Sequence, residues 1–377
     1  MATLIAKITE NCNSNCRYCD VVRKKGSGKT MTHEVLENLF IKSNQYLLDH
    51  KEEHISILWH GGEPLLPGIK YYQKIIALQE KYCAATKDRI KHAIQTNLTC
   101  FNDDFAAIFS QLGITAVGTS YDAEMNMRGI GKSVDTLAYN QKFMRALRLL
   151  KKYNIGWGMI YVVTKKSLED PLGVFFLLTN LLLTGGINFN PVLIYDDERK
   201  DLAITPSEYV EFLGAIFPVW YEHRHRYPEV EPFRSLVNNI IKGHRHLGCV
   251  DSGDCTYHHI NIAPNGDASQ CGRSSDWNLL DYGSILDSSI EEILSHPERD
   301  QLEERVQLLQ HKDCAGCRFW ELCHGGCPLD AWSKHNSFQH KSEWCYAKKG
   351  FIEKYFEPIT GVRFEPENKK EYAHTGA

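Results

Sequence analysis

Three cysteines near the N-terminus form the pattern in this sequence that is most typical of a reactive metal site. Cys12, Cys16 and Cys19 stand as Cys-x3-Cys-x2-Cys, shortly after an apolar run. An ordinary iron–sulfur or zinc site is closed by four protein ligands. A [4Fe–4S] cluster held by only three thiolates would leave one iron open to a small molecule, and chemistry could take place at that iron.

A second set of cysteines lies in the last third of the chain. Its members are Cys249, Cys255, Cys271, Cys314, Cys317, Cys323, Cys327 and Cys345. Eight thiolates suffice for two fully ligated [4Fe–4S] clusters, although four also suit zinc. Nothing at the N-terminus resembles a signal peptide, so metal ligation explains the 13 cysteines better than disulfides do. Cys83 and Cys100 fall outside both sets and are expected to be ordinary thiols.

A glycine pair followed by an acidic residue comes directly after the apolar run Ile55–Trp59. The motif reads Gly61-Gly62-Glu63-Pro64. Glycines permit close approach of the backbone, and a carboxylate accepts hydrogen bonds from an ammonium group. Four histidines near these motifs are expected to pack or form hydrogen bonds rather than bind metal, because cysteines already fill the sites. They are His60, His258, His259 and His324.

The elements that must position these residues alternate between short β-branched runs and longer amphipathic segments. Strands are expected at Thr3–Ile8, Ile55–Trp59, Ile90–Gln95, Ile114–Thr119, Ile155–Val163 and Ile187–Asn190. Helices are expected at Thr32–His50, Tyr71–Tyr82, Asp103–Leu112, Thr136–Tyr153 and Glu169–Leu183. This order predicts an α/β fold, a parallel sheet curled into a partial (β/α)6 TIM-type barrel. Active sites of such folds lie at the carboxyl ends of the strands.

The pattern changes after residue 196. Helices are expected at Thr205–Tyr227 and Glu231–His246, followed by a cysteine-rich region with few periodic runs. We predict a barrel domain over residues 1–235 with bridging helices from about 197, a small cluster-binding domain over 236–346, and a C-terminal helix and tail over 347–377. Such a small domain would be stabilised by its metal clusters.

The N-terminal motifs resemble those of the radical S-adenosylmethionine (SAM) enzymes. The resemblance rests on Cys12–Cys19 with its Tyr18 and on Gly61–Pro64. It implies a [4Fe–4S] cluster whose open iron is chelated by the methionine part of SAM, and a 5′-deoxyadenosyl radical formed by one-electron cleavage. The implied SAM-binding residues are Gly61, Gly62 and Glu63 for the amino group, Ser120 and Arg145 for the carboxylate, and Asn97. Leu98 follows Asn97 where the family usually has glycine.

The later cysteines resemble the SPASM extension of radical SAM peptide-modifying enzymes. By this resemblance, auxiliary cluster I takes Cys249, Cys255, Cys271 and Cys327, and auxiliary cluster II takes Cys314, Cys317, Cys323 and Cys345. The cofactors implied for the chain are therefore three [4Fe–4S] clusters and SAM.

Within this family, two segments look most similar to maturases of ribosomally made peptides. They are Trp59–Leu66 and Cys323–Asp330. Full ligation of both auxiliary clusters would leave no open iron for a substrate thiolate. We therefore predict an oxidoreductase that abstracts a hydrogen from a precursor peptide and installs an oxidative intramolecular cross-link of the cyclophane type, a C–C or C–heteroatom bond.

Two alternatives stay open. An anaerobic sulfatase maturase, which oxidises a cysteine or serine of a protein to formylglycine, has a similar length and the same eight-cysteine layout. In such enzymes an aspartate base directly follows the cysteine that matches Cys271, whereas this chain has Gly272 and leaves Asp254 and Asp276 as candidate bases. The other alternative is an iron–sulfur electron-transfer protein. Such a carrier needs no ammonium-binding motif, which the segment Gly61–Glu63 resembles.

Bulk properties restrict the partners. A net charge of −4 gives no basic field for nucleic acid, and the longest apolar stretch is too short for a membrane span. We expect a cytoplasmic protein whose partners are a precursor peptide and an external reductant such as flavodoxin or ferredoxin. The chain starts at the first barrel strand, so we expect the leader peptide to be recognised without an N-terminal recognition domain.

Overall fold

The computed structural model describes residues 2–19, 28–122, 124–181, 183–244, 246–253, 255 and 258–366. The chain forms two compact units that interleave along the sequence. We call them the barrel unit (Met1–Ile204, His223–Pro232 and Tyr257–Asp300) and the cysteine-rich unit (Thr205–Glu222, Phe233–Thr256 and Gln301–Ala377). Each unit is described by itself. The domain boundaries expected from the sequence stay predictions.

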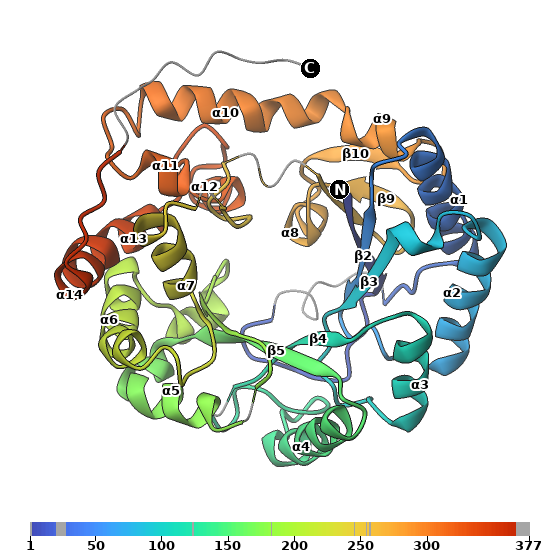
Figure 1. Cartoon of the computed structure of the whole chain (residues 1–377), viewed down its shortest axis with the longest axis horizontal. Coiled ribbons are helices and arrows are strands. Elements are labelled where there is room, and N and C mark those ends of the chain that lie inside the picture. The colour runs from blue at the N-terminus through green and yellow to red at the C-terminus, as the bar shows by residue number, and fades with distance from the viewer. Residues whose placement is uncertain are drawn as a thin grey trace. The chain divides into compact units, whose positions relative to one another are not determined.

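The barrel unit is built on two sheets, whose strands are parallel except for the antiparallel pairs β8–β9 and β9–β10 (Figure 1). The first sheet has the order β10-β9-β8-β1-β2-β3, and the second has the order β4-β5-β6-β7. A bridge between Gln95 and Gly118 connects β3 to β4 in parallel. The strands are β1 (Ala2–Thr9), β2 (Ile55–Gly61), β3 (Ile90–Ile94), β4 (Ala116–Ser120), β5 (Gly156–Val163), β6 (Ile187–Pro191), β7 (Val230–Glu231), β8 (His259–Ile262), β9 (Asp267–Ser269) and β10 (Asp281–Ser284).

The predicted α/β partial barrel is confirmed, with each of its six strands within a few residues of its expected bounds. One feature of the sheet was not predicted. The β8–β9 hairpin comes from the cysteine-rich part of the sequence, yet β8 pairs in parallel with β1, from Thr3 opposite His259 to Ala6 opposite Ile262. The barrel sheet therefore joins the N-terminal strand β1 to a hairpin from the last third of the chain.

Five helices follow the strands and cover the outer side of the sheets (Figure 1). They are α1 (His33–Asp49), α2 (Ile69–Tyr82), α3 (Asp103–Gln111), α4 (Thr136–Lys152) and α5 (Pro171–Thr179). The predicted cap of the first helix is confirmed, because the Thr32 hydroxyl accepts a hydrogen bond from the Val35 amide at 3.2 Å. Leu39 and Phe40 on α1 are fully buried, and each such side chain stabilises the fold by about 1.5–3 kcal/mol.

The cysteine-rich unit is helical. Its elements are α6 (Pro206–Glu222), α7 (Phe233–Leu236), a π-helical turn (Val237–Ile241), α10 (Asp300–His311), α11 (Trp320–Cys323), α12 (Pro328–His335), α13 (Cys345–Phe351), a second π-helical turn (Ile352–Phe356) and α14 (Glu357–Thr360). Phe217 on α6 lies at the centre of an aromatic core. Its ring centroid is 5.1–5.5 Å from those of Phe233, Phe351 and Phe356.

The helix expected over Glu231–His246 is wrong in its first part. Glu231 belongs to β7 and pairs with Asn188 of β6. Pro232 follows and has no amide hydrogen to continue a helix, so the chain turns helical only at Phe233.

Two short barrel-unit helices complete the fold, α8 (Gly272–Asp276) and α9 (Ile290–Leu294). In the ranges that the structure describes, no helix is long and apolar enough to cross a membrane.

Candidate active site

The three N-terminal cysteines lie on a loop that leaves the carboxyl end of β1. The loop is held by a segment that follows β4, because the Asn15 amide donates to the Gly129 carbonyl and the Arg17 amide to the Met127 carbonyl, both at 2.9 Å. Within the loop, the Cys19 amide donates to the Cys16 carbonyl at 3.1 Å. The loop therefore lies at the carboxyl ends of the strands, where barrels of this kind have their active sites.

The thiols on this loop are close enough to influence one another electrostatically. The pKa of Cys12 is raised to about 12, chiefly by burial and in smaller part by negative charge on Glu63, Cys16 and Cys19. Burial likewise raises the pKa of Cys16 to about 11. Without a cation these thiols stay protonated, whereas an iron–sulfur cluster deprotonates its ligands. The Ser14 amide already donates to Cys12 Sγ at 3.4 Å, the kind of N–H···S bond found around such clusters.

Gly61 and Gly62 hold the end of β2 against the chain that leads into the cysteine loop. The Gly62 amide donates to the Thr9 carbonyl at 2.7 Å, and the Glu63 amide to the Asn11 carbonyl at 2.8 Å. A Cβ atom on Gly61 would lie 2.2 Å from the Thr9 oxygen, and one on Gly62 would lie 2.3 Å from the Asn11 oxygen. These contacts leave no room for a side chain.

Glu63 is fully buried and joins the loops after β2 and β3. Its Oε1 accepts hydrogen bonds from Thr96 Oγ1 at 2.7 Å and from the Leu65 amide at 2.9 Å, and its Oε2 accepts one from the Asn97 amide at 2.7 Å. Burial raises the pKa of this carboxyl to about 7 in spite of these donors. The sequence did not predict this bracing role. Binding of a substrate ammonium by Glu63 stays a prediction.

Asn97 extends the same network to the cysteine loop. Its Nδ2 donates to Asn13 Oδ1 at 2.9 Å and to Ser14 Oγ at 3.1 Å, and it lies 3.8 Å from Cys12 Sγ. Leu98, which stands in place of the usual glycine, has a φ of +63° and is fully buried. The left-handed backbone that glycine adopts freely is thus retained by a leucine, at a cost of about 1–2 kcal/mol.

Ser120 and Arg145, the residues expected to bind a carboxylate, are placed differently from one another. Ser120 ends β4, and its hydroxyl accepts a hydrogen bond from Gln95 Nε2 at 3.4 Å. Arg145 lies on the exposed face of α4, whose buried face carries Tyr139, Phe143 and Ala146. The structure therefore brings Ser120 to the carboxyl ends of the strands but leaves Arg145 in solvent.

A different arginine, Arg128, faces the cysteine loop. Its Nε donates to Asp122 Oδ2 at 2.8 Å, and its Nη2 donates to the hydroxyl of Tyr18, which is hydrogen-bonded to the same carboxylate oxygen. Both members of the ion pair are buried, and the positive charge of Arg128 opposes the rise in the pKa of Cys16. Sequence reasoning missed this residue because it lies between strand and helix, outside any periodic pattern.

A polar trio occupies the inner side of the barrel strands. Lys7 on β1 is 3% exposed, and its Nζ contacts Asp276 Oδ1 on α8 at 2.5 Å. His60 on β2 stands opposite Lys7 in the ladder and is partly exposed. Of the two candidate bases, Asp276 is thus already ion-paired, and Asp254 lies outside the described residues. Gly272 begins α8, and a Cβ there would approach Asn261 Oδ1 at 4.0 Å, so the position expected for a base offers room but no carboxylate.

The cysteines predicted for auxiliary cluster II all belong to the cysteine-rich unit. Cys314 packs with Leu309 and Trp320, and Cys323 and Cys345 are in hydrogen-bond contact. That contact raises the pKa of the Cys323 thiol and lowers the pKa of Cys345. Electrostatic interactions also link Cys314 and Cys317 to Cys345. This mutual proximity fits four thiolate ligands of one cluster.

The cysteines predicted for auxiliary cluster I are divided between the units. Cys249, Cys255 and Cys327 belong to the cysteine-rich unit, whereas Cys271 belongs to the barrel unit, where its amide donates to Ser274 Oγ at 2.9 Å. Their grouping stays a prediction. Asp251 anchors the loop between the first two, since its carbonyl contacts His324 Nδ1 at 3.0 Å. The hydrogen-bonding role expected for His324 is thereby confirmed.

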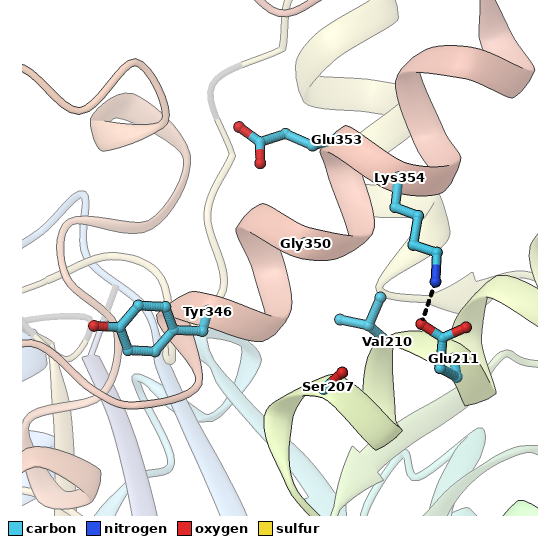
Figure 2. A pocket seen from close by; sticks show the side chains of 7 residues that line it. All are labelled: Ser207, Val210, Glu211, Tyr346, Gly350, Glu353 and Lys354. Carbon is cyan, nitrogen blue, oxygen red and sulfur yellow. Dashed lines mark hydrogen bonds and ion pairs between the residues drawn. The ribbon is translucent and has the colours of Figure 1, made fainter.

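A pocket of about 410 Å³ also lies in the cysteine-rich unit, between α6 and the helical segment that begins with α13 (Figure 2). It is lined by Ser207, Val210, Glu211, Tyr346, Gly350, Glu353 and Lys354. An ion pair of 2.6 Å joins Lys354 Nζ to Glu211 Oε1 at its side. The lining includes none of the residues predicted to bind SAM or metal.

Comparison with known families agrees with this arrangement of cysteines. The model of the radical SAM superfamily matches residues 6–178. This chain belongs to the radical SAM superfamily. The model of SPASM, an iron-sulfur cluster-binding domain, matches residues 254–318. The chain is thus a radical SAM enzyme, and its predicted cofactors, three [4Fe–4S] clusters and SAM, are confirmed. The assignment of single cysteines to each cluster stays a prediction.

Curated relatives of this radical SAM enzyme align over most of its length. It is 26% identical over 96% of the chain to a cysteine-type anaerobic sulfatase-maturating enzyme of Clostridium perfringens, of which it covers 98%. It is 24% identical over 86% of the chain to a serine-type anaerobic sulfatase-maturating enzyme of Bacteroides thetaiotaomicron, of which it covers 81%. The solved structure of native anSMEcpe with bound AdoMet matches with a TM-score of 0.79 and 25% identity, covering 95% of this chain and 98% of that one.

These comparisons contradict the predicted main function. The cyclophane-type cross-linking of a ribosomally made precursor peptide is wrong, because relatives that align over nearly the whole radical SAM chain are named sulfatase-maturating enzymes. The alternative given by the sequence, a sulfatase-maturase-type enzyme, agrees better with them. The glycine at position 272 argued against that alternative. If the alternative holds, a group other than a carboxylate at position 272 must act as the base.

Proposed function

We propose that this radical SAM enzyme oxidises the side chain of a cysteine in a peptide or protein to formylglycine. The observation that carries the proposal is the alignment with the cysteine-type enzyme of Clostridium perfringens over 96% of this chain and 98% of that one. The serine-type relative aligns over a smaller share, 86% of this chain. If all the clusters act in one reaction, an enzyme that catalyses this reaction should align with the chain over both the barrel unit and the cysteine-rich unit.

The missing carboxylate at Gly272 also favours a cysteine substrate. Oxidation of either side chain requires the heteroatom to lose its proton. A thiol has a pKa near about 8.5, far below that of an aliphatic hydroxyl, so it loses its proton to a weaker base. A site without an aspartate at position 272 is therefore better suited to cysteine than to serine.

The residues around the three N-terminal cysteines fit the cofactor that this reaction needs. In the proposal, Cys12, Cys16 and Cys19 hold the cluster, and Gly61, Gly62, Glu63, Asn97 and Ser120 form the walls of the SAM site. Bound there, the cluster and SAM would supply a 5′-deoxyadenosyl radical able to remove a hydrogen atom from the substrate Cβ. The networks of Glu63 and Asn97 keep the three loops of the site in register, which orients the substrate carbon.

The electron released by the substrate needs an acceptor in the protein. We assign this role to the clusters predicted in the SPASM domain, with Cys249, Cys255, Cys271 and Cys327 as one ligand set and Cys314, Cys317, Cys323 and Cys345 as the other. An external reductant such as flavodoxin or ferredoxin would supply the electron that starts each turnover. The substrate and this reductant are both expected in the cytoplasm.

The test is anaerobic incubation of the reconstituted enzyme with SAM, dithionite and a cysteine-containing peptide. We expect a product in which the thiol is replaced by an aldehyde, detected by mass spectrometry and by trapping with a hydrazine. The same peptide with alanine in place of its cysteine serves as the control. A product that keeps its sulfur and loses two hydrogens would contradict the proposal.

A further inference from the structure

Two histidines on neighbouring strands of the barrel unit differ in the hydrogen-bond partners and the exposure of their rings. His92 on β3 is buried, its Nδ1 accepts from Trp59 Nε1 at 3.2 Å, and its Nε2 contacts Gln79 Oε1 at 3.1 Å. His60 on β2 is partly exposed, and no hydrogen bond to its ring is found within the described residues. Burial lowers the pKa of both to about 4. His92 is thus held by two hydrogen-bond partners, whereas the described residues provide none for the ring nitrogens of the partly exposed His60.

Strand geometry places His60 on the inner side of the barrel. Side chains alternate along a strand, and the preceding residue, Trp59, is fully buried on the outer side. The ladder partner of His60 is Lys7, so the two side chains lie on the same face of adjacent strands. The next residue, Gly61, begins the motif that packs against the cysteine loop. His60 therefore stands at the carboxyl end of β2, beside the proposed SAM site.

Neither neighbour of His60 is suited to accept a proton. Lys7 is a buried ammonium, and Asp276 is its ion-pair partner at 2.5 Å. Protonation of Asp276 would leave the Lys7 cation buried without a counter-ion, which is unfavourable. The charged groups that act on His60 from the described elements around it are these two, Lys7 from β1 and Asp276 from α8.

We propose that His60, beside the buried Lys7–Asp276 ion pair, is the proton acceptor that replaces the carboxylate missing at Gly272. This inference rests on the proposed function, because it assigns one step of that oxidation. After a hydrogen atom has left the substrate Cβ, the carbon radical carries an S–H group. The S–H proton goes to His60 as a carbon–sulfur double bond forms, and the electron released would be taken up by an iron–sulfur cluster held by cysteines of the SPASM domain. Water then hydrolyses the thioaldehyde to the aldehyde and hydrogen sulfide.

The charge state of His60 agrees with this role. Burial is the largest cause of its lowered pKa, the cation of Lys7 lowers it further, and the anion of Asp276 opposes both. The ring is therefore neutral at about pH 7 and has a lone pair for the substrate proton, and the same lowered pKa makes it a weaker base than an ordinary histidine. An ordinary histidine would lose that lone pair to protonation near about pH 6.5.

The first experiment compares His60→Ala with the matched control His92→Ala in the reconstituted holoenzyme. We expect His60→Ala to release 5′-deoxyadenosine but to form aldehyde at least tenfold more slowly, and added imidazole to restore aldehyde formation. Imidazole should not change His92→Ala. His60→Asn, a smaller change, guards against misfolding. A wild-type rate in His60→Asn, or a folded His60→Ala that imidazole does not rescue, would overturn the inference.

The second experiment does not depend on activity. Diethyl pyrocarbonate acylates neutral histidines, and peptide mapping of the holoenzyme reports each site. Between about pH 6 and 8 we expect acylation of His60 to be independent of pH, while exposed histidines react more slowly as they become protonated towards pH 6. In Lys7→Met the midpoint for His60 should move upward. A His60 profile like that of the exposed histidines would refute the assigned charge state.

The outcomes separate the inference from the proposed function. Aldehyde formed equally by the wild type and His60→Asn would sink the role of His60 and leave the oxidation standing. Failure of the wild type to form aldehyde, with the expected acylation profile, would instead reject the oxidation as the reaction served by this histidine.

Discussion

Lys7 and Asp276 lie 269 residues apart in the chain and form an ion pair of 2.5 Å inside the barrel unit. The pair joins β1, which leads to Cys12, Cys16 and Cys19, to α8, which begins directly after Cys271. The relationship connects the beginning of the proposed active site to the segment in which a base was expected. The contribution of this ion pair to stability can be measured.

Removal of one partner should destabilise the barrel unit. Asp276→Asn leaves the Lys7 ammonium buried without a counter-ion, and we expect the free energy of unfolding to fall by about 3 kcal/mol. Urea unfolding followed by tryptophan fluorescence measures the change. The double variant Lys7→Met/Asp276→Leu should recover most of it, because the buried Lys7 cation is removed together with its counter-ion. The exposed pair Lys152–Asp103 is the control, and its removal should change the midpoint little.

Close backbone packing at Gly62 should be required for the N-terminal cluster. Gly62→Ala places a Cβ 2.3 Å from the Asn11 oxygen, so the cysteine loop must shift. We expect the variant to bind less iron after reconstitution and to lose release of 5′-deoxyadenosine. Gly113→Ala is the control, because a Cβ on Gly113 would meet nothing within 4 Å, although Gly113, unlike Gly62, has a positive φ of +67°. Equal iron content in Gly62→Ala and the wild type would contradict this account.

Leu98 should give an unusual order of stabilities. Leu98→Ala loses a buried side chain and keeps the left-handed backbone, so we expect a loss of about 3 kcal/mol. Leu98→Gly loses the same contacts but relieves the backbone, and we expect a loss of about 2 kcal/mol. Thermal or urea unfolding of both variants distinguishes them. An alanine variant more stable than the glycine variant would mean that the strain at Leu98 is negligible.

Substitution of Arg128 and of Arg145 should have very different effects on stability and on SAM affinity. Arg128→Met leaves Asp122 buried without its counter-ion, and we expect a loss of about 3–5 kcal/mol of stability together with weaker SAM binding. Arg145→Ala, on the exposed face of α4, should leave unfolding and SAM affinity unchanged. Equilibrium binding of SAM to the reconstituted proteins is the measurement. A loss of SAM affinity in Arg145→Ala would restore the prediction made from the sequence.

Glu63 should make the stability of the protein depend on pH. Its pKa in the folded state, about 7, is above the ordinary value of about 4.3 for an unfolded glutamate. The folded state therefore binds this proton more tightly, and stability falls as pH rises from about 5 to about 7.5, by up to a few kcal/mol. The slope should be smaller in Glu63→Gln. Urea midpoints at the two pH values test the prediction, and an unchanged slope in the variant would assign the dependence to other groups.

The sequence by itself determined those features that depend on local spacing. Residues three or four apart share a helix face and residues two apart share a strand face, so periodicity alone predicted the six barrel strands and the helices between them. Short motifs likewise carry their own chemistry. Cys12, Cys16 and Cys19 identified the superfamily, and Thr32 identified a helix start.

Tertiary structure decided which distant residues meet. Periodicity does not reveal that β8 pairs with β1, that Lys7 reaches Asp276, or that Arg128 and not Arg145 is buried beside the cysteine loop. Each of these depends on how the strands pair and how the loops pack once the chain has folded. Folding brings such side chains together because burial favours it, and a buried charge then requires a partner wherever that partner lies in the chain.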